Sequence, residues 1–152
     1  MTMIYMPAQP DHVTDLSKIA DATLFPGDML PELIAPFLEG AQDQLWITAL
    51  RDGVPVGLSF TRAEELADAV WNMKALAVSP ALHRSGVGQG LVRATEDAVR
   101  EMGGRLLVVD TSSDVAQIPA VAFYQSVGYR IEGVVRDFWA EGEDRISLAK
   151  RL

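Results

Sequence analysis

Three glycines in the stretch HRSGVGQG, residues 83–90, stand directly before a helical pattern and are the chemically most suggestive feature of the chain. Glycine weakens a helix by about 1 kcal/mol relative to alanine, so three of them at a helix start need an explanation. The first turn of a helix has N–H groups without partners and a partial positive charge, and it binds anions. Glycine lets a bulky diphosphate approach those amides, and Arg84 adds a cation. The stretch therefore predicts a diphosphate site, with a tight strand-to-helix turn as the alternative.

Two common nucleotide-binding patterns fail at this stretch. A Walker loop needs Lys and then Ser or Thr after its last glycine, and no Lys follows these glycines. A dinucleotide fingerprint, G-x-G-x-x-G, fails at its third glycine, where Leu91 stands. Neither nucleotide class is supported.

The segment LAVSPALHRSGVGQGLV, residues 76–92, resembles the acetyl-coenzyme A signature of the GNAT superfamily of N-acetyltransferases. That signature is a strand ending in V-x-P, then [Q/R]-x-x-G-x-[G/A], then a helix. Gly86 and Gly88 occupy its two small positions, whereas His83 stands where Gln or Arg is usual. The neighbouring Arg84 can supply the missing cation, so the departure concerns only the outer phosphate contact.

A second segment, QIPAVAFYQSVGY at residues 117–129, resembles the pattern N-x-x-A-x-x-F-Y-x-x-x-G-[F/Y] on the next helix of the same family. Gln117 stands in the Asn position. The matching residues are Ala120, Phe123, Tyr124, Gly128 and Tyr129. The two motifs occur in the family's order with one apolar strand between them, and on this basis the chain is identified as a member of the superfamily.

The resemblance implies acetyl-CoA as the donor and direct attack of an amine on its thioester in a ternary complex. The chain has no cysteine, which excludes an acetyl-cysteine intermediate. In the family, the strand before the diphosphate site separates from its neighbour, and the N–H of Val78 matches its oxyanion donor. The alternative is an ordinary buried strand. The residues expected to bind the coenzyme are Leu76, Ala77, Val78, His83, Arg84, Ser85, Gly86, Val87, Gly88, Gln89, Gly90, Gln117, Ala120, Phe123 and Tyr124.

Tyr124 matches the family's acid for the leaving thiolate. A thiol with a pKa near ~8.5 and a tyrosine with a pKa near ~10 make full proton transfer uphill by roughly 2 kcal/mol. Hydrogen bonding from Tyr124 to the developing thiolate is therefore the firmer expectation. A core tyrosine on a helix face is the alternative.

The ammonium group of the acceptor must lose a proton before it attacks, and several carboxylates are candidates for the base. They are Glu64, Glu65, Asp68 and Asp137, of which Glu65 is our choice, and a base acting through ordered water is equally open. For each carboxylate, a solvated surface charge is the alternative.

Family analogy locates the acceptor site in residues 25–34, 62–72 and 136–144. Trp71, Phe138 and Trp139 are candidates for an aromatic wall, with core or dimer contacts as the alternative. Asp28, Glu65 and Asp137 are candidates for holding a cation, which suits an amine, a polyamine or a peptide N-terminus. The expected substrate-binding residues are Glu65, Trp71, Asn72, Asp137 and Trp139.

The hydrophobic pattern predicts the elements that would position these residues. Helical spacing occurs in residues 12–24, 29–40, 86–104 and 118–129. Strand patterns occur in residues 3–10, 44–63 around an Asp52–Gly53 turn, 69–80, 105–113, and 130–152 around a turn at residues 141–144. The order β-α-α-β-β-β-α-β-α-β-β predicts an α/β fold of the GNAT type, with a mixed, mostly antiparallel sheet flanked by about four helices.

The bulk composition sets the remaining expectations. A chain of 152 residues without repeats or linkers predicts one domain, residues 1–152. The net charge of -8 argues against nucleic acid as a partner, and no apolar run reaches the roughly 18 residues that span a membrane. No signal-peptide pattern or metal-ligand set is apparent, so a cytoplasmic protein without a metal is expected.

Family analogy alone suggests a homodimer. An acyl-CoA-binding sensor without turnover is the alternative function.

Overall fold

The structure, a computed structural model, describes residues 2–152, in which strands and α-helices follow each other in the predicted order. The strands are β1 (Met3–Pro7), β2 (Gln44–Arg51), β3 (Val54–Ala63), β4 (Val70–Val78), β5 (Leu106–Ser112), β6 (Arg130–Ala140) and β7 (Glu143–Arg151). The helices are α1 (Val13–Thr23), α2 (Leu30–Leu38), α3 (Val87–Glu101) and α4 (Ile118–Ser126). Short 3-10 helices lie at Pro10–His12, Gly27–Met29, Pro80–Leu82 and Val115–Gln117.

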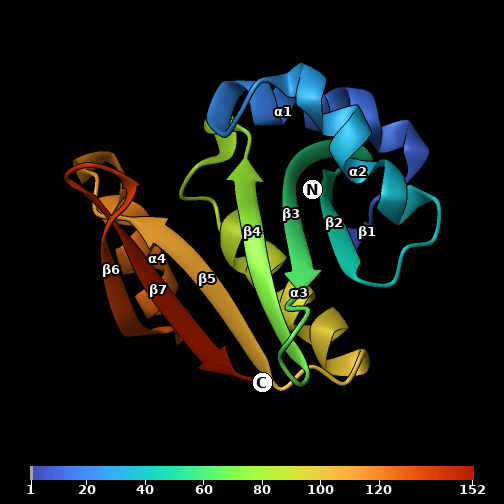
Figure 1. The fold of residues 1–152 in the computed structure, drawn as a ribbon. Coiled ribbons are helices and arrows are strands. Elements are labelled where there is room, and N and C mark those ends of the chain that lie inside the picture. Colours follow the sequence, from blue (N-terminus) through green and yellow to red (C-terminus); the bar gives the residue numbers. More distant parts are fainter. Residues whose placement is uncertain (1) are drawn as a thin grey trace.

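The strands form one sheet in the order β1-β2-β3-β4-β5-β7-β6. Neighbouring strands are antiparallel except β4 and β5, which are parallel and are connected through α3. β4 and β5 pair only through Val70–Asn72 and Leu106–Val108. Beyond these residues the two strands separate, so the sheet is open at one end (Figure 1).

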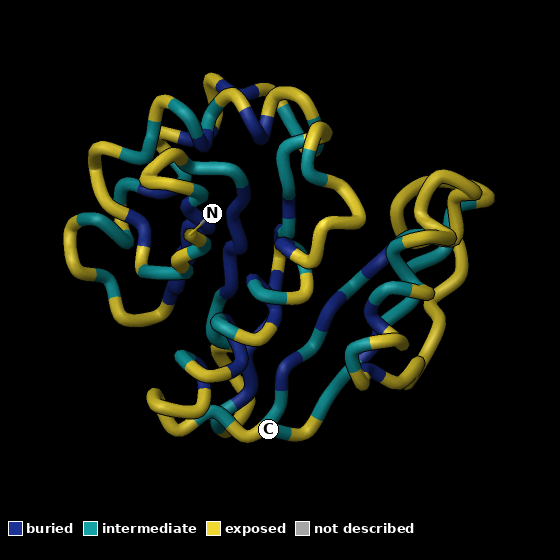
Figure 2. The backbone as a smooth tube through the Cα atoms, turned by 180° about the vertical axis from the view of Figure 1, so that it is seen from behind, coloured by how far each residue is buried: buried dark blue, intermediate teal, exposed yellow. Residues whose placement is uncertain are grey.

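Helices cover both faces of the sheet and produce two apolar cores. On one face, α1 and α2 enclose a cluster around Trp46, whose ring stacks on Phe60 with centroids 4.3 Å apart. On the other face, the core contains residues of α3 and α4, and Figure 1 shows both helices behind the sheet. Figure 2 shows the buried positions along the middle strands, whereas the tip of the β6–β7 hairpin is exposed. Side chains of β4 therefore contribute to both cores, Ala75 and Ala77 to one and Trp71 and Met73 to the other.

Local sequence signals explain several boundaries. Asp52 and Gly53 both have positive φ, 50° and 82°, as a two-residue type I′ hairpin turn requires. The register of β3 and β4 shifts between Phe60 and Thr61, which leaves Lys74 as the extra residue of a β-bulge.

The predicted fold class is confirmed, with two corrections to element boundaries. The last hairpin turns within Glu141–Gly142 rather than over residues 141–144, because Gly142 adopts a φ of 82° and allows a tighter turn. The first strand ends at Pro7 rather than at residue 10, because Pro10 starts a 3-10 helix, where a missing N–H has no cost.

None of the helices described in residues 2–152 is both long and apolar enough to cross a membrane. In the same part of the chain, no three His, Asp or Glu side chains are grouped closely enough to hold a metal ion.

Candidate active site

The separation of β4 from β5 exposes one edge of β4 along residues 73–78. Ser79 donates its N–H to the carbonyl of Val56, in β3, at 2.8 Å. Since successive residues of a strand direct their backbone groups to opposite sides, Val78 directs its N–H and C=O into the gap toward β5. His83 Nε2 lies 2.9 Å from the Val78 carbonyl oxygen, which ties the loop before α3 to this edge. The Val78 N–H therefore faces the open part of the sheet.

The start of α3 lies beside the same gap. Gly86 precedes the helix with a φ of 90°, a left-handed conformation that glycine adopts without strain. Arg84 is also left-handed, with a φ of 63°. The amides of Gly86–Gln89 have no acceptor within the helix, as at any helix start. This segment can therefore bind an anion through four backbone donors and the Arg84 guanidinium.

A cavity of about 780 Å³ lies between β4, the start of α3 and α4. Its wall contains most of the residues predicted to bind the coenzyme: Leu76, Val78, His83, Arg84, Gly86, Gly88, Gln89, Ala120, Phe123 and Tyr124. The two motifs of the sequence thus meet across one hollow, one motif on each side.

Other residues predicted to bind the coenzyme are not on this wall. Ala77 packs in the core under α1 and α2, and Val87 packs in the core under α3. The Ser85 hydroxyl donates to the Leu82 carbonyl, and Gln117 is exposed at the end of its 3-10 helix. None of these four residues lines the cavity.

Each of the three glycines in residues 83–90 is needed for a different structural reason. Gly86 supplies the positive φ, and Gly88 faces the cavity, where an added Cβ would lie 3.5 Å from Phe123. Gly90 instead contacts β1: an added Cβ would overlap the phenol ring of Tyr5. The Gly90 N–H is already donated to the Gly86 carbonyl at 3.0 Å. Coenzyme binding by Gly90 stays a prediction, which the occupied amide and the packing contact with Tyr5 do not favour.

Tyr124 is 7% exposed, and its ring makes edge contacts with Phe123 and Tyr129. Among residues 2–152, its hydroxyl has no hydrogen-bond partner, although the side chain lines the cavity. Burial raises the pKa of Tyr124 well above its usual value near 10. The phenol is therefore a protonated donor at any physiological pH, which makes it suited to donate a hydrogen bond rather than to accept a proton.

A polar cluster lies on the opposite face of the sheet, where β4 and β5 begin to separate. Asn72 Nδ2 donates to Glu64 Oε1 and to Asp110 Oδ2, both at 3.1 Å. Ser147 of β7 donates to Asp110 Oδ1 at 2.6 Å, and Arg145 Nε lies 4.0 Å from the same oxygen. Sequence analysis identified Glu64 and Asn72 but missed Asp110, Arg145 and Ser147. The available signal was Asp110 itself, the one charged residue in the apolar run LLVVD.

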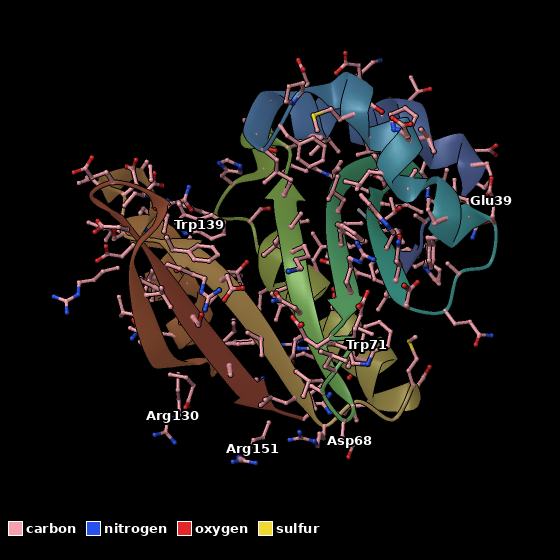
Figure 3. All side chains as sticks on the ribbon, viewed as in Figure 1. Glu39, Asp68, Trp71, Arg130, Trp139 and Arg151 are labelled. Carbon is pink, nitrogen blue, oxygen red and sulfur yellow. The ribbon has the colours of Figure 1, made fainter. Side chains whose placement is uncertain are left out.

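The predicted aromatic wall does not form as one unit. Trp71 is 7% exposed and packs in the core at the closed end of the sheet, where it pairs with Leu107. Trp139 lies at the other end, half exposed, and donates from Nε1 to the Thr111 carbonyl at 3.0 Å. Figure 3 shows Trp71 and Trp139 in different parts of the molecule. Substrate binding by Trp71 stays a prediction, whereas its burial agrees with the alternative of a core residue.

The remaining predicted acidic residues are dispersed. Glu65 lines a separate cavity of about 410 Å³ together with Glu64, Arg62 and Lys74. Asp137 accepts from the Gly142 N–H at 2.8 Å, so it shapes the β6–β7 hairpin. Asp28 is exposed in the 3-10 helix before α2.

Comparisons with known proteins agree with this geometry. A model of the acetyltransferase (GNAT) family matches residues 12–129. A protein from Desulfovibrio desulfuricans assigned to the GNAT acetyltransferases superposes with a TM-score of 0.90 at 24% identity, covering 99% of each chain. An aminoglycoside 6'-N-acetyltransferase from Enterococcus faecium gives 0.80 at 18% identity, covering 97% of this chain and 96% of its own.

A third structure, the ribosomal-protein-S18-alanine N-acetyltransferase of Escherichia coli, gives a TM-score of 0.79 at 17% identity, covering 99% of this chain and 94% of its own. Another aminoglycoside 6'-N-acetyltransferase, with a TM-score of 0.80 at 18% identity, is in complex with coenzyme A. No curated protein sequence matches the chain significantly. At these identities the solved structures establish the fold, and the family model establishes the family.

Proposed function

Since the chain belongs to the acetyltransferase (GNAT) family, whose donor is acetyl-CoA, we propose that it acetylates a primary amine of a small molecule or a peptide by direct attack in a ternary complex. The observation that carries the proposal is the cavity of about 780 Å³ between the two motifs. One end of it has the anion-binding start of α3, and the rest is walled largely by apolar side chains such as Leu76 and Phe123.

This cavity fits the parts of acetyl-CoA. The amides of residues 86–89 and Arg84 suit its diphosphate, and Gly88 leaves room that a larger side chain would fill. The unpaired edge of β4 suits the amide groups of the pantetheine arm, because it offers N–H and C=O groups without strand partners. When bound, the coenzyme supplies an acetyl group activated as a thioester.

Two residues of this chain are assigned chemical roles. The direction of the Val78 N–H into the gap supports its role as donor to the carbonyl oxygen, where negative charge develops during attack. The place of Tyr124 in the cavity wall supports its role as hydrogen-bond donor to the leaving sulfur. Because burial raises the Tyr124 pKa, a shared hydrogen bond rather than complete proton transfer is expected.

The proposal is tested in two steps. Coenzyme A should raise the melting temperature, whereas NAD and ATP at equal concentration should not. Release of free thiol from acetyl-CoA should then depend on an added amine, in a panel that covers alkylamines, polyamines, an aminoglycoside and a peptide with N-terminal alanine. Stabilisation by coenzyme A without thiol release for any amine would favour the acyl-CoA sensor instead.

A cytoplasmic location and a homodimer stay predictions, as does the choice between small amine and peptide. The net charge of -8 supports a cationic acceptor, because the field of the protein attracts it.

A further inference from the structure

We propose that strand β6 is the contact surface of a homodimer, in which the free edges of two β6 strands pair antiparallel about a two-fold axis at Val134. The partner is a second copy of this chain. The inference concerns the edge of the sheet and not the cavity, so it is independent of the proposed acetyl transfer.

β6 is an exposed strand with many apolar side chains. All eleven of its residues are exposed, and Figure 1 shows the strand at the outer edge of the sheet. Its large apolar side chains, each between 44% and 55% exposed, are Ile131, Val134, Val135, Phe138 and Trp139. Val134 lies opposite Ile146 and Val135 opposite Arg145, so apolar side chains occur on both faces of the strand. Single apolar residues are normal on a surface, whereas five on one strand mark an interaction site.

The two edges of the sheet differ in how well they resist pairing. β1, at one edge, has only five residues and ends at Pro7, which has no N–H for a further strand. β6, at the other edge, has eleven residues and neither proline nor lysine. Its register against β7 shifts between Ile131 and Gly133, which leaves Glu132 as an extra, charged residue. A strand that pairs with β6 must therefore match the charge of Glu132.

The pairing within the sheet determines which backbone groups of β6 are free. Ser113 donates its N–H to the Asp144 carbonyl at 3.0 Å, so Asp144 of β7 directs its backbone groups toward β5. Backbone directions alternate along a strand, so Ile146 also points toward β5. Val134 lies directly opposite Ile146 and hence directs its N–H and C=O away from β7. These groups are available to a second strand at the free edge.

The charges of β6 complement each other when Val134 lies on the two-fold axis. Glu132 and Arg136 are each two residues from Val134, on opposite sides. In an antiparallel pair centred on Val134, Glu132 of each copy therefore lies opposite Arg136 of the other, and two ion pairs form. Within residues 2–152, neither side chain forms an ion pair in the single chain. A two-fold contact of this kind uses the same patch on both copies.

The neighbouring registers lack this complementarity. Backbone directions must match, so the axis can otherwise move only to Gly133 or Val135 at its nearest. With Gly133 on the axis, Arg130 would lie opposite Arg136 twice, which places like charges together. With Val135 on the axis, Arg136 would lie opposite Val134 and form no ion pair. Charge pairing therefore selects Val134.

Charge exchange tests the contact and its register together. Sedimentation velocity over a concentration series should show a species of about 33 kDa, twice the 16.5 kDa of one chain. Glu132→Arg sets arginines opposite each other and Arg136→Glu sets glutamates opposite each other, so each variant alone should dissociate at least tenfold more readily. An equimolar mixture of the two should recover the dimer, because the ion pairs form again between unlike copies. Glu39→Arg, an exposed site after α2, is the matched control and should dimerise as the wild type does.

An introduced cysteine tests the axis directly, since the chain has no cysteine of its own. Val134→Cys places two thiols on the axis, where opposite Cα atoms lie about 5.5 Å apart, within reach of a disulfide. Oxidation with copper phenanthroline should therefore link two copies, as seen on a non-reducing gel. Ile131→Cys is the matched control: it is similarly exposed, but its two copies would lie about 20 Å apart and should not be linked.

The outcomes decide the inference without reference to activity. A chain that stays monomeric at every concentration would overturn it, and so would a dimer that neither charge variant weakens. Linkage through Ile131→Cys as complete as through Val134→Cys would also overturn it. An unchanged circular dichroism spectrum shows that each variant has folded. Loss of dimerisation with retained acetyl transfer would leave the proposed function intact.

Discussion

Two neighbouring tyrosines, Tyr124 and Tyr129, lie in the same core with ring centroids 5.8 Å apart but have different surroundings. The Tyr129 hydroxyl donates to Glu96 Oε2 at 2.8 Å, and Lys150 Nζ lies 3.1 Å from that oxygen. The Tyr124 hydroxyl has no such partner among residues 2–152 and belongs to the cavity wall. One phenol is therefore structural, and the other is available for a ligand.

Tyr124→Phe should lower kcat at least tenfold while the affinity for coenzyme A barely changes. The variant keeps the ring and its packing but removes the donor to the developing thiolate. Steady-state kinetics and calorimetric binding of coenzyme A measure the two effects. Since burial raises the Tyr124 pKa, the wild-type enzyme should show no loss of kcat from this group up to about pH 10. Unaltered turnover would remove Tyr124 from the mechanism.

Tyr129→Phe should instead lower the stability of the protein and leave kcat nearly unchanged. It removes a hydrogen bond to a buried carboxylate, so the free energy of unfolding should fall by roughly 1–3 kcal/mol in urea denaturation. Glu96 keeps its contact with Lys150, which limits the loss. The kcat of the folded enzyme should change less than twofold, and a tenfold fall would show that the two tyrosines are not functionally distinct.

Alkaline pH should destabilise the protein through the same residue. Burial and the bond to Glu96 raise the pKa of Tyr129, so the folded state keeps its proton where the unfolded state loses it. The contribution of protonated Tyr129 to the free energy of unfolding is fully present below the pKa of the unfolded state, near 10. It is lost as the pH rises from there toward the higher pKa of the folded state. Tyr129→Phe should therefore show a shallower fall in stability between about pH 10 and pH 11 than the wild type. Equal slopes of the free energy of unfolding against pH for the variant and the wild type would contradict this.

At the scale of elements, α3 combines a binding end with a packing face. Gly88 and Gly90 are two residues apart in the same helix, yet one borders the cavity and the other touches Tyr5 of β1. The spacing of glycines in sequence cannot separate these cases, because the contact with Tyr5 depends on how β1 is placed under α3. The same limit applies to Trp71, which packs in the core and against Gly104, where an added Cβ would lie 3.1 Å from its ring.

A matched pair of variants tests this division of α3. Gly88→Leu places a side chain toward Phe123 and Val78 and should weaken coenzyme A binding at least tenfold without lowering the melting temperature, since leucine favours helix. Gly90→Ala should instead lower stability by about 1–3 kcal/mol, because the Tyr5 ring must move. Its coenzyme affinity should stay within twofold of wild type, and a tenfold loss would return Gly90 to the binding site.

Much of the architecture could be predicted from sequence, because hydrophobic periods and turn residues act locally. The order of elements and the two motifs on either side of one strand needed no long-range information. The separation of β4 from β5 could not be derived in this way, since Leu76–Val78 also suits an ordinary buried strand. Asp110 was missed for a related reason: its partners, Asn72 and Ser147, come from strands distant in sequence. Only the assembled sheet brings them together.

For the whole molecule, the short pairing between β4 and β5 divides the sheet into two parts. β1–β4 and β5–β7 share only three paired positions, and the cavity lies across the division, with α3 on one side and α4 on the other (Figure 1). A ligand in that cavity would contact both parts. Binding should therefore stabilise the connection between them as well as the fold as a whole.

Coenzyme A at about 100 times its Kd should raise the free energy of unfolding by about 2.7 kcal/mol, which corresponds to a melting temperature higher by about 5–10 °C. Amide hydrogen exchange should slow most at residues 73–78, at the start of α3 and along α4, because these segments line the cavity from both parts of the sheet. Gly88→Leu serves as the control, since its filled cavity should abolish both effects at the same coenzyme concentration. Protection confined to residues 84–90, with α4 unaffected, would mean that the coenzyme binds at the helix start without spanning the gap, and the thioester would then not reach Tyr124.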